Sequence, residues 1–228
     1  MNNNGSTPKE LFKYLPRKFA EQMVNEGRIR VALLGYYKNM ELGNAVGDDQ
    51  EGTRSWSITG DPNGTLKDRV IRIANGGIIS GTFTNVGHIY KQFTVTPALY
   101  IYCVSAKKSA DIMHEFGSDT CVRISEPRTF FLMMTLELLR IGKIIPLFNN
   151  AGPAPCIYKS RHIEVNGKIA SDYDAPDINQ SPVWLQKDPS YSYQKEVRMT
   201  WVPKEKNPDQ FIYLKCEAFR NNCEIIKL

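Results

Sequence analysis

The sequence predicts an α+β fold, and three observations lead to this prediction. Residues 11–34 open the chain with a strand-like, a helical and a second strand-like pattern. Residues 109–140 carry the other helical patterns. The segments after residue 142 have only strand-like patterns and loops. No internal repeat is visible along the chain.

The first three elements have clear boundaries. A strand at residues 11–14 is followed by Pro16, whose fixed φ angle and missing N–H group suit the first turn of a helix. Gly27 stands where a left-handed residue would end that helix. Residues 29–34 then alternate with the period of a strand. The apolar stripe of the helix consists of Phe19, Ala20, Met23 and Val24.

A long loop and a group of hairpins are expected next. Residues 36–51 lose the apolar pattern, and residues 44–52 are too polar and Gly-rich for regular structure. A loop of this length in a compact domain is often functional. Between residues 55 and 95, short strand-like runs such as 70–73 and 77–80 alternate with turn signals, which predicts β-hairpins.

The middle of the chain combines a deep strand with two helices. Residues 99–104 are apolar or aromatic on both faces, as expected of a central strand covered on both sides. Ser109 is the predicted cap of a short helix that Gly117 closes. After a strand at residues 121–124, the longest helix starts at Ser125 and extends through Arg140.

The last quarter is predicted to hold strands and loops. The strands are expected at about residues 156–165, 196–202, 211–219 and 223–228. The stretch 193–201 reads as a strand with two unlike faces. Its apolar row is Val197, Met199 and Trp201. Its polar row is Gln194, Glu196, Arg198 and Thr200.

Composition favours one globular domain over residues 1–228, with residues 1–8 flexible. Apolar content of 42% and charged content of 23% exclude a disordered chain. The net charge of +5 is spread thinly, so it permits an anionic partner without demanding one. Five cysteines without a C-x-x-C pair predict small core residues and a cytoplasmic location. The longest apolar run, residues 130–139, is too short to span a bilayer, so no membrane contact is expected.

Several familiar sites are excluded or left open. The chain has neither a G-x-G-x-x-G turn nor a phosphate-binding P-loop. The scattered histidines, His88, His114 and His162, make a zinc site improbable. The acidic loop, Asp48, Asp49 and Glu51, is either a divalent-cation site or a solvated turn in which Arg54 pairs with Glu51.

Two pairs of neighbouring residues and one carboxylate are candidate site residues. Tyr36 and Tyr37 either stack on a planar ring of a ligand or cap the core. Lys13 and Tyr14 either bind an anion or form an edge charge beside a core aromatic ring. Glu196 has a salt-bridge interpretation with Arg198 and a catalytic one, because Gln194 and Glu196 stand together where the chain enters a sheet.

Taken in order, these motifs resemble the ADP-ribosyltransferase fold. The resemblance is carried by the strand at 11–14, the helix ending in Gly27, the strand at 28–31 and the late Gln194-x-Glu196 triplet. Within that fold, the chain is similar to transferase toxins of bacterial toxin-antitoxin-chaperone systems in phage defence. The motifs shared with that group are Tyr36-Tyr37 with Glu41, the loop 47–53 and the stretch 194–198.

The resemblance implies a split β-sandwich of two small sheets with flanking helices, and an NAD-dependent glycosyltransferase activity. NAD would be the co-substrate, and its glycosidic bond would break through an oxocarbenium-like transition state. Glu196 would stabilise the charge that develops on the ribose, and Gln194 would orient the acceptor. The resemblance also implies the remaining contacts. Cofactor-binding residues would be Lys13, Tyr14, Arg30, Tyr36 and Tyr37, and loop or acceptor residues would be Asp49, Glu51 and Arg54.

The implied acceptor is RNA or a protein, with RNA favoured by the net positive charge. An antitoxin protein would be a further partner. Lys13 departs from the Arg or His that such transferases carry on the first strand. Two alternatives belong to other classes: a non-catalytic binding module of the same fold, and a divalent-metal nuclease that uses the acidic loop.

Overall fold

In the computed structural model, the described residues are 8–38, 53–59, 65–72, 78–84, 89–94, 99–146, 152–160, 162–166 and 182–228. They divide into two compact units. The first unit comprises residues 1–51, 96–156 and 190–228, and the second comprises residues 52–95 and 157–189. The single domain predicted over residues 1–228 stays a prediction.

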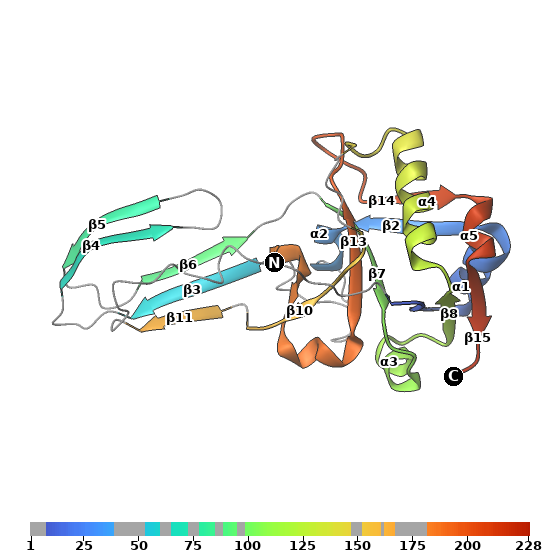
Figure 1. Cartoon of the computed structure of the whole chain (residues 1–228), viewed down its shortest axis with the longest axis horizontal. Helices are drawn as coiled ribbons and strands as arrows, with labels where there is room; N and C mark the ends of the chain where they lie inside the picture. Colours follow the sequence, from blue (N-terminus) through green and yellow to red (C-terminus); the bar gives the residue numbers. More distant parts are fainter. Residues whose placement is uncertain are drawn as a thin grey trace. The chain divides into compact units, whose positions relative to one another are not determined.

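The first unit is built on a sheet whose strand order is β14-β2-β7-β1-β8-β15, with β13 pairing with both β7 and β9 (Figure 1). All these pairs are antiparallel. The strands are β1 (Leu11–Leu15), β2 (Arg28–Leu33), β7 (Tyr100–Ser105), β8 (Thr120–Ile124), β9 (Ala154–Pro155), β13 (Glu196–Trp201), β14 (Phe211–Lys215) and β15 (Cys223–Ile226). The predicted α+β class is therefore confirmed.

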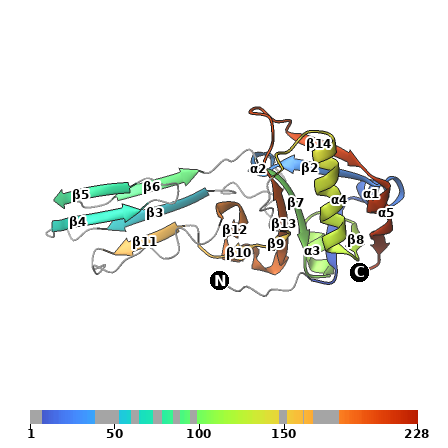
Figure 2. The ribbon, with the colours of Figure 1, turned by 45° about the horizontal axis from the view of Figure 1, so that its top comes forward.

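The longest helix covers one face of this sheet. Figures 1 and 2 show α4 lying across the strands. Its side chains Phe130, Met134 and Leu138 share one buried cluster with Val197 and Trp201 of β13. The indole Nε1 of Trp201 donates a hydrogen bond to Thr135 Oγ1 of α4 (2.8 Å). The helices of this unit are α1 (Arg17–Glu26), α2 (Leu34–Lys38), α3 (Ala110–Glu115), α4 (Pro127–Arg140), α5 (Glu217–Asn221) and the 3-10 helix η2 (Pro189–Gln194).

A smaller apolar cluster lies around α3. It joins Phe12 and Tyr14 of β1 with Ile112 of α3 and Cys121 of β8. Ser109 caps α3, as predicted, by accepting a hydrogen bond from Ile112 N. Successive residues of β1 therefore belong to different clusters, since Leu11 is part of the cluster under α4 and Phe12 is part of the cluster around α3.

The second unit consists of short strand pairs. Strand β3 pairs antiparallel with β6 and parallel with β11, β4 pairs antiparallel with β5, and β10 pairs parallel with β12. Its elements are β3 (Thr53–Thr59), β4 (Thr65–Arg72), β5 (Ile78–Thr84), β6 (Ile89–Thr94), β10 (Ile157–Tyr158), β11 (His162–Asn166), the 3-10 helix η1 (Val183–Leu185) and β12 (Gln186–Lys187). The predicted strand content between residues 55 and 95 is thus confirmed.

Four sequence predictions were wrong about the bounds of elements. Residues 34–38 form α2 instead of strand and loop. Residues 217–221 form α5, so the predicted strand 211–219 is only five residues long, and a helix does follow residue 142. The predicted strand 156–165 is divided between β10 and β11. The N-cap of α4 is Glu126 instead of Ser125, whose hydroxyl donates to Asn222 O.

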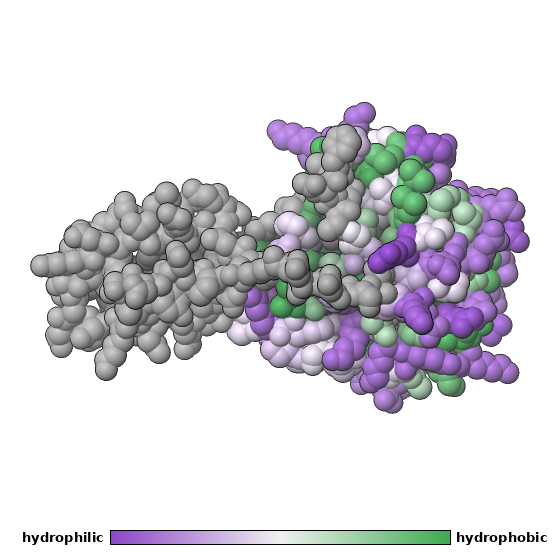
Figure 3. Space-filling model, in the orientation of Figure 1, coloured by the Kyte–Doolittle hydropathy of each residue, from purple (hydrophilic) through white to green (hydrophobic). Residues whose placement is uncertain are grey.

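Some hydrophobic side chains remain on the surface of the first unit. Leu132 and Leu136 of α4 are 57% and 49% exposed, and Figure 3 shows hydrophobic surface over this helix. Among the described helices, none has the length and apolar character that crossing a bilayer requires.

Gly27 joins α1 to β2 in a conformation that a side chain would disturb. It has φ +62°, and a Cβ atom there would lie 2.2 Å from the carbonyl oxygen of Cys216. We expect Gly27→Ala to lower the free energy of unfolding by more than about 1 kcal/mol, because it adds a backbone clash to an unfavourable φ angle. Urea denaturation measures the loss. Gly117→Ala, at φ +58° with open space around its Cβ position, is the matched control and should lose less.

Candidate functional site

The central strand β7 is paired differently on its two edges. One edge pairs with β13 from Tyr100 to Ser105. The other edge pairs with β2 at Tyr100 and Ile101 and with β1 at Ser105. Cys103 lies between these two registers. Its carbonyl oxygen accepts a hydrogen bond from Lys13 Nζ (2.6 Å), so a side chain of β1 contacts the backbone where β1 and β2 separate.

A buried ion pair lies on β13 beside this position. Glu196 and Arg198 are 8% and 2% exposed, and Arg198 Nε donates to Glu196 Oε1 (2.5 Å). In the antiparallel register Arg198 lies opposite Cys103 and Glu196 lies opposite Ser105. Glu196 therefore forms the ion pair with Arg198 that the salt-bridge interpretation predicts. The pair holds a carboxylate in a fixed orientation close to Lys13.

Burial lowers the pKa of Lys13 below its usual value. The neighbouring Cys103 and Glu196 oppose this shift, whereas Arg30 adds to it. The ammonium also lies 4.8 Å from the ring centroid of Tyr102. Lys13 is thus a desolvated cation whose proton is held less firmly than that of a surface lysine.

Tyr37 belongs to the same group of side chains. Burial raises the pKa of its hydroxyl well above the usual value, and Cys103, Arg30, Glu196 and Arg198 all influence it electrostatically. Burial also raises the pKa of the Cys103 thiol, and the neighbouring Glu196 carboxylate adds to this shift. We name this group the buried charge cluster. Its members are Lys13, Tyr37, Cys103, Glu196 and Arg198, and the exposed Arg30 acts on it electrostatically.

A small cavity opens beside Lys13. Its volume is about 80 Å³. Pockets that enclose a whole ligand usually measure roughly 300–1,000 Å³. This cavity therefore has room for a phosphate or another group of similar size, but not for an entire dinucleotide. Its polar and aromatic lining includes Lys13, Gln22, Arg28, Arg30, Tyr37 and Tyr213.

Three of the predicted site residues line this cavity, and a fourth is coupled to two of them electrostatically. Lys13, Arg30 and Tyr37 line it, and Glu196 is coupled electrostatically to Lys13 and Tyr37. Lys13, Arg30 and Tyr37 come from β1, β2 and α2 in the first part of the chain, whereas Glu196 comes from the distant strand β13. The sequence patterns thus selected side chains that the fold brings together.

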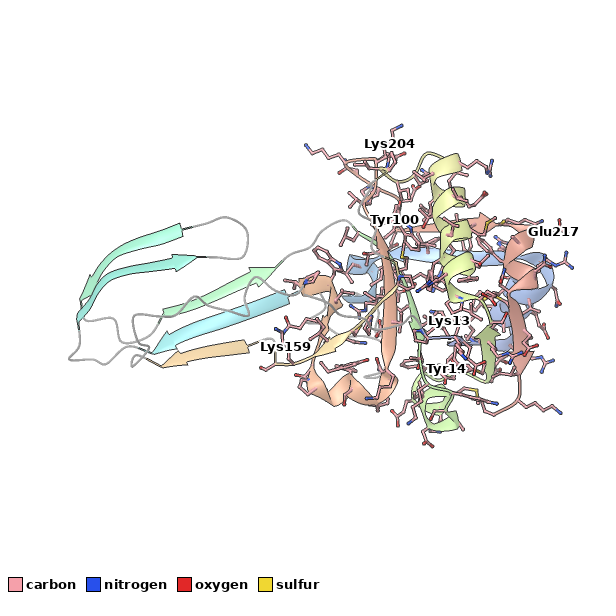
Figure 4. The ribbon with its side chains drawn as sticks, in the orientation of Figure 1. Lys13, Tyr14, Tyr100, Lys159, Lys204 and Glu217 are labelled. Carbon is pink, nitrogen blue, oxygen red and sulfur yellow. The ribbon has the colours of Figure 1, made fainter. Side chains whose placement is uncertain are left out.

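Tyr14 and Tyr36 have other surroundings. The Tyr14 hydroxyl donates to Lys107 O (2.6 Å) and accepts from Ser109 N (2.9 Å), and burial raises its pKa to about 12. Figure 4 labels Tyr14 next to Lys13 on β1, where neighbouring side chains point to opposite faces. Tyr36 packs edge-to-face against Phe211 and under the Arg30 guanidinium, outside the cavity lining.

Gln194 does not belong to the strand that carries Glu196. It ends the 3-10 helix η2, and Lys195 has φ +45°, so β13 begins only at Glu196. The Gln194 side chain is buried, and its amide nitrogen lies 3.4 Å from Tyr193 OH. The prediction that Gln194 and Glu196 share the polar row of one strand was wrong, because a left-handed residue separates them.

The predicted acidic loop cannot be placed. Asp48, Asp49 and Glu51 lie outside the described residues, and Arg54 is described only through the pairing of β3 with β6. Among the described side chains, no group of three or more His, Cys, Asp or Glu residues could hold a metal ion. His114 is exposed near the end of α3, and all five cysteines are free.

Sequence reasoning missed Cys103 and Tyr102 as neighbours of the site. The alternating pattern of residues 99–104 places Tyr102 and Cys103 on opposite faces of a central strand. Only the register of β7 with β13 shows that Cys103 lies opposite Arg198. Comparison with known proteins adds nothing to this assignment, since no family model, curated protein or solved structure matches the chain.

The lowered pKa of Lys13 predicts a pH effect on stability. Between the folded pKa and the ordinary lysine value, the unfolded chain binds more protons at this position. The free energy of unfolding should therefore gain up to about 1.4 kcal/mol per pH unit as the pH rises through that window. We expect Lys13→Met to lack this gain. Urea denaturation of both proteins at each pH measures the difference, and parallel curves would contradict the prediction.

Proposed function

We propose that the protein is an NAD-dependent ADP-ribosyltransferase that modifies a macromolecule. The observation that carries this proposal is the buried charge cluster, in which the Glu196 carboxylate is fixed by Arg198 and coupled electrostatically to Lys13, which lines a small cavity together with Arg28 and Arg30. A fixed carboxylate suits the stabilisation of positive charge on a ribose. The cationic lining suits the phosphates of a dinucleotide.

Glu196 is the proposed catalytic residue. Its carboxylate would accept a hydrogen bond from a hydroxyl of the nicotinamide ribose and stabilise the charge that develops at the anomeric carbon. Arg198 is a positioning residue, because its Nε donates to one carboxylate oxygen and fixes the plane of the group. Preorganised contacts of this kind act mainly in the transition state, where the charge is largest.

Lys13 and Arg30 are the proposed pyrophosphate contacts. Lysine offers a compact point charge, and arginine offers a planar fork of donors. Both side chains line the cavity, whose size admits a phosphate group. Tyr37 lines the same cavity and is the better-placed of the two tyrosines for a contact with the nicotinamide ring, because Tyr36 is occupied by Arg30 and Phe211.

The acceptor and the biological setting extend the proposal. We infer an RNA acceptor ahead of a protein acceptor, a role as a toxin in phage defence, a cytoplasmic location and an antitoxin partner. The mild net charge of +5 supports an anionic acceptor. The motifs shared with transferase toxins support the rest.

Release of nicotinamide tests the proposed reaction. The purified chain is incubated with NAD, a metal chelator and either total RNA or cell lysate, and free nicotinamide is measured over time. We expect release that depends on the added macromolecules and continues in chelator. Absence of release under all conditions would contradict the transferase. Cleavage of the RNA that stops on chelation would instead support a metal nuclease, and NAD-independent retention of a lysate protein would support a binding module.

A further inference from the structure

The outer face of β2 and β14 carries cations and aromatic rings side by side. Their antiparallel register places Tyr213 opposite Arg30 and Lys215 opposite Arg28. The intervening side chains of both strands, such as Val31 and Leu214, belong to the buried core. Because alternate residues share one side of a strand, the outer side chains form a single surface. We name it the β2–β14 face, and it consists of Arg28, Arg30, Phe211, Tyr213 and Lys215.

The rings on this face are ordered by the cations but remain open to solvent. The Arg28 guanidinium lies 4.8 Å from the ring centroid of Tyr213, and the Arg30 guanidinium lies 6.0 Å from that of Phe211. The two rings pack edge-to-face with centroids 5.6 Å apart. Phe211 is 38% exposed and Tyr213 is 46% exposed. Each ring therefore keeps free surface on which a planar group can stack.

The positive charge of the face is not neutralised by neighbouring acids. Arg28, Arg30 and Lys215 are exposed, and none of them forms an ion pair within the part of the chain that the structure describes. Some other surface cations are paired, since Arg123 pairs with Glu224 and Lys143 pairs with Asp209. The face thus presents three uncompensated charges next to two exposed rings.

The face continues into the cavity of the candidate site. Arg28, Arg30 and Tyr213 also line the cavity beside Lys13. A polyanion that lies along β2 and β14 would therefore pass the entrance of this cavity.

We propose that the β2–β14 face binds single-stranded nucleic acid. The cations would neutralise phosphates, and Phe211 and Tyr213 would stack on bases. A duplex offers the same charge but keeps its base faces stacked, and an acidic peptide leaves the rings without planar partners. The statement that this nucleic acid is also the acceptor of the transferase rests on the proposed function. The binding itself follows from the contacts of the face alone.

Fluorescence anisotropy of a labelled oligonucleotide tests the inference. The full chain carrying Glu196→Gln is titrated, without NAD, into a 20-nucleotide oligoribonucleotide, into the matching oligodeoxyribonucleotide and into the duplex of that oligodeoxyribonucleotide with its complement. We expect binding that weakens with salt, and Tyr213→Ala should weaken it about 5- to 150-fold, because base stacking on one aromatic ring typically contributes roughly 1–3 kcal/mol. Arg28→Ala should lower the slope of log K against log salt by about 1.

The controls separate this face from general positive charge. Arg28→Glu and Lys227→Glu change the net charge equally, but Lys227 follows β15, at the other end of the strand order. We expect Arg28→Glu to weaken binding strongly and Lys227→Glu to change it less than twofold. Circular dichroism confirms that the variants are folded. Equal effects of the two charge changes, or tighter binding of the duplex than of the single strand, would overturn the inference.

The outcomes also separate this inference from the proposed function. Preference for the ribose over the deoxyribose oligonucleotide identifies RNA as the ligand, and equal affinity identifies any single strand. Polyglutamate that competes as well as the oligonucleotide would overturn the inference and indicate a surface for acidic proteins. Since the titration needs neither NAD nor catalysis, a protein that releases no nicotinamide can still bind, and a transferase that fails to bind would contradict only this inference.

Discussion

Glu196→Gln is expected to lower the rate of nicotinamide release from NAD by about 10²-fold or more. Glutamine keeps the shape of the side chain and can still accept the hydrogen bond from Arg198, but it removes the negative charge. The affinity for NAD should change less than the rate, because the charge acts mainly on the transition state. The measurement is the initial rate of nicotinamide release at saturating NAD.

The matched control is Glu224→Gln. Glu224 lies on β15, at the far end of the same sheet, and is paired with Arg123 on the surface. This variant should release nicotinamide at the wild-type rate. If both variants keep that rate, Glu196 is not the catalytic carboxylate. Equal losses in both would mean that the substitutions act on the stability of the sheet instead of on catalysis.

Arg198→Met is expected to cost about 3–5 kcal/mol of unfolding free energy. Arg198 is 2% exposed and pairs with the buried Glu196, so its removal takes one partner from a buried ion pair in the core of the first unit. Urea denaturation at neutral pH measures the loss. The double variant with Glu196→Gln should recover part of the lost free energy of unfolding, because the buried carboxylate charge is then absent.

Arg123→Met is the control for this prediction. Its ion pair with Glu224 is on the surface, where the side chains are 40% and 53% exposed. Exposed ion pairs contribute only about 0–1 kcal/mol. Losses of similar size for Arg198→Met and Arg123→Met would contradict the view that the Glu196–Arg198 pair is buried and energetically important.

The parts of the fold that the sequence predicts well are those that local physics decides. Helix α1 ends at Gly27 because glycine, which has no Cβ atom, adopts the left-handed conformation of a helix C-cap without strain. Strand β7 is apolar on both faces and is buried on both, since Tyr102 and Val104 belong to the main cluster and Ile101, on the other face, is 1% exposed. Val197, Met199 and Trp201 are 3%, 4% and 1% exposed, as the alternation of β13 predicted.

The errors occur where backbone conformation or tertiary contacts override a local pattern. The alternation around Glu196 extends back to Gln194, yet Lys195 at φ +45° interrupts the strand. Nothing in the residue types requires that angle. Similarly, Phe219 fits a continued strand, but it packs into the main core from the short helix α5, which begins after Cys216.

The residues of the candidate site could be predicted from the sequence, but the contacts between them could not. Lys13, Arg30, Tyr37 and Glu196 were selected from separate motifs, and the fold brings them together. The contact of Lys13 with the carbonyl of Cys103 depends on the separation of β1 and β2 beside β7. Such long-range pairing has no signal in a single sequence, because register is set by the complete sheet.

Transfer of a radiolabel from the adenylate phosphate of NAD to a macromolecule tests the central claim most directly. Purified wild-type protein and Glu196→Gln are incubated with labelled NAD, chelator and cell lysate, and the RNA and protein fractions are then separated and counted. The proposed site predicts label in a macromolecule, principally in RNA, with wild-type protein and about 10²-fold less with Glu196→Gln. Absence of label from both fractions, or equal labelling by the two proteins, would contradict it.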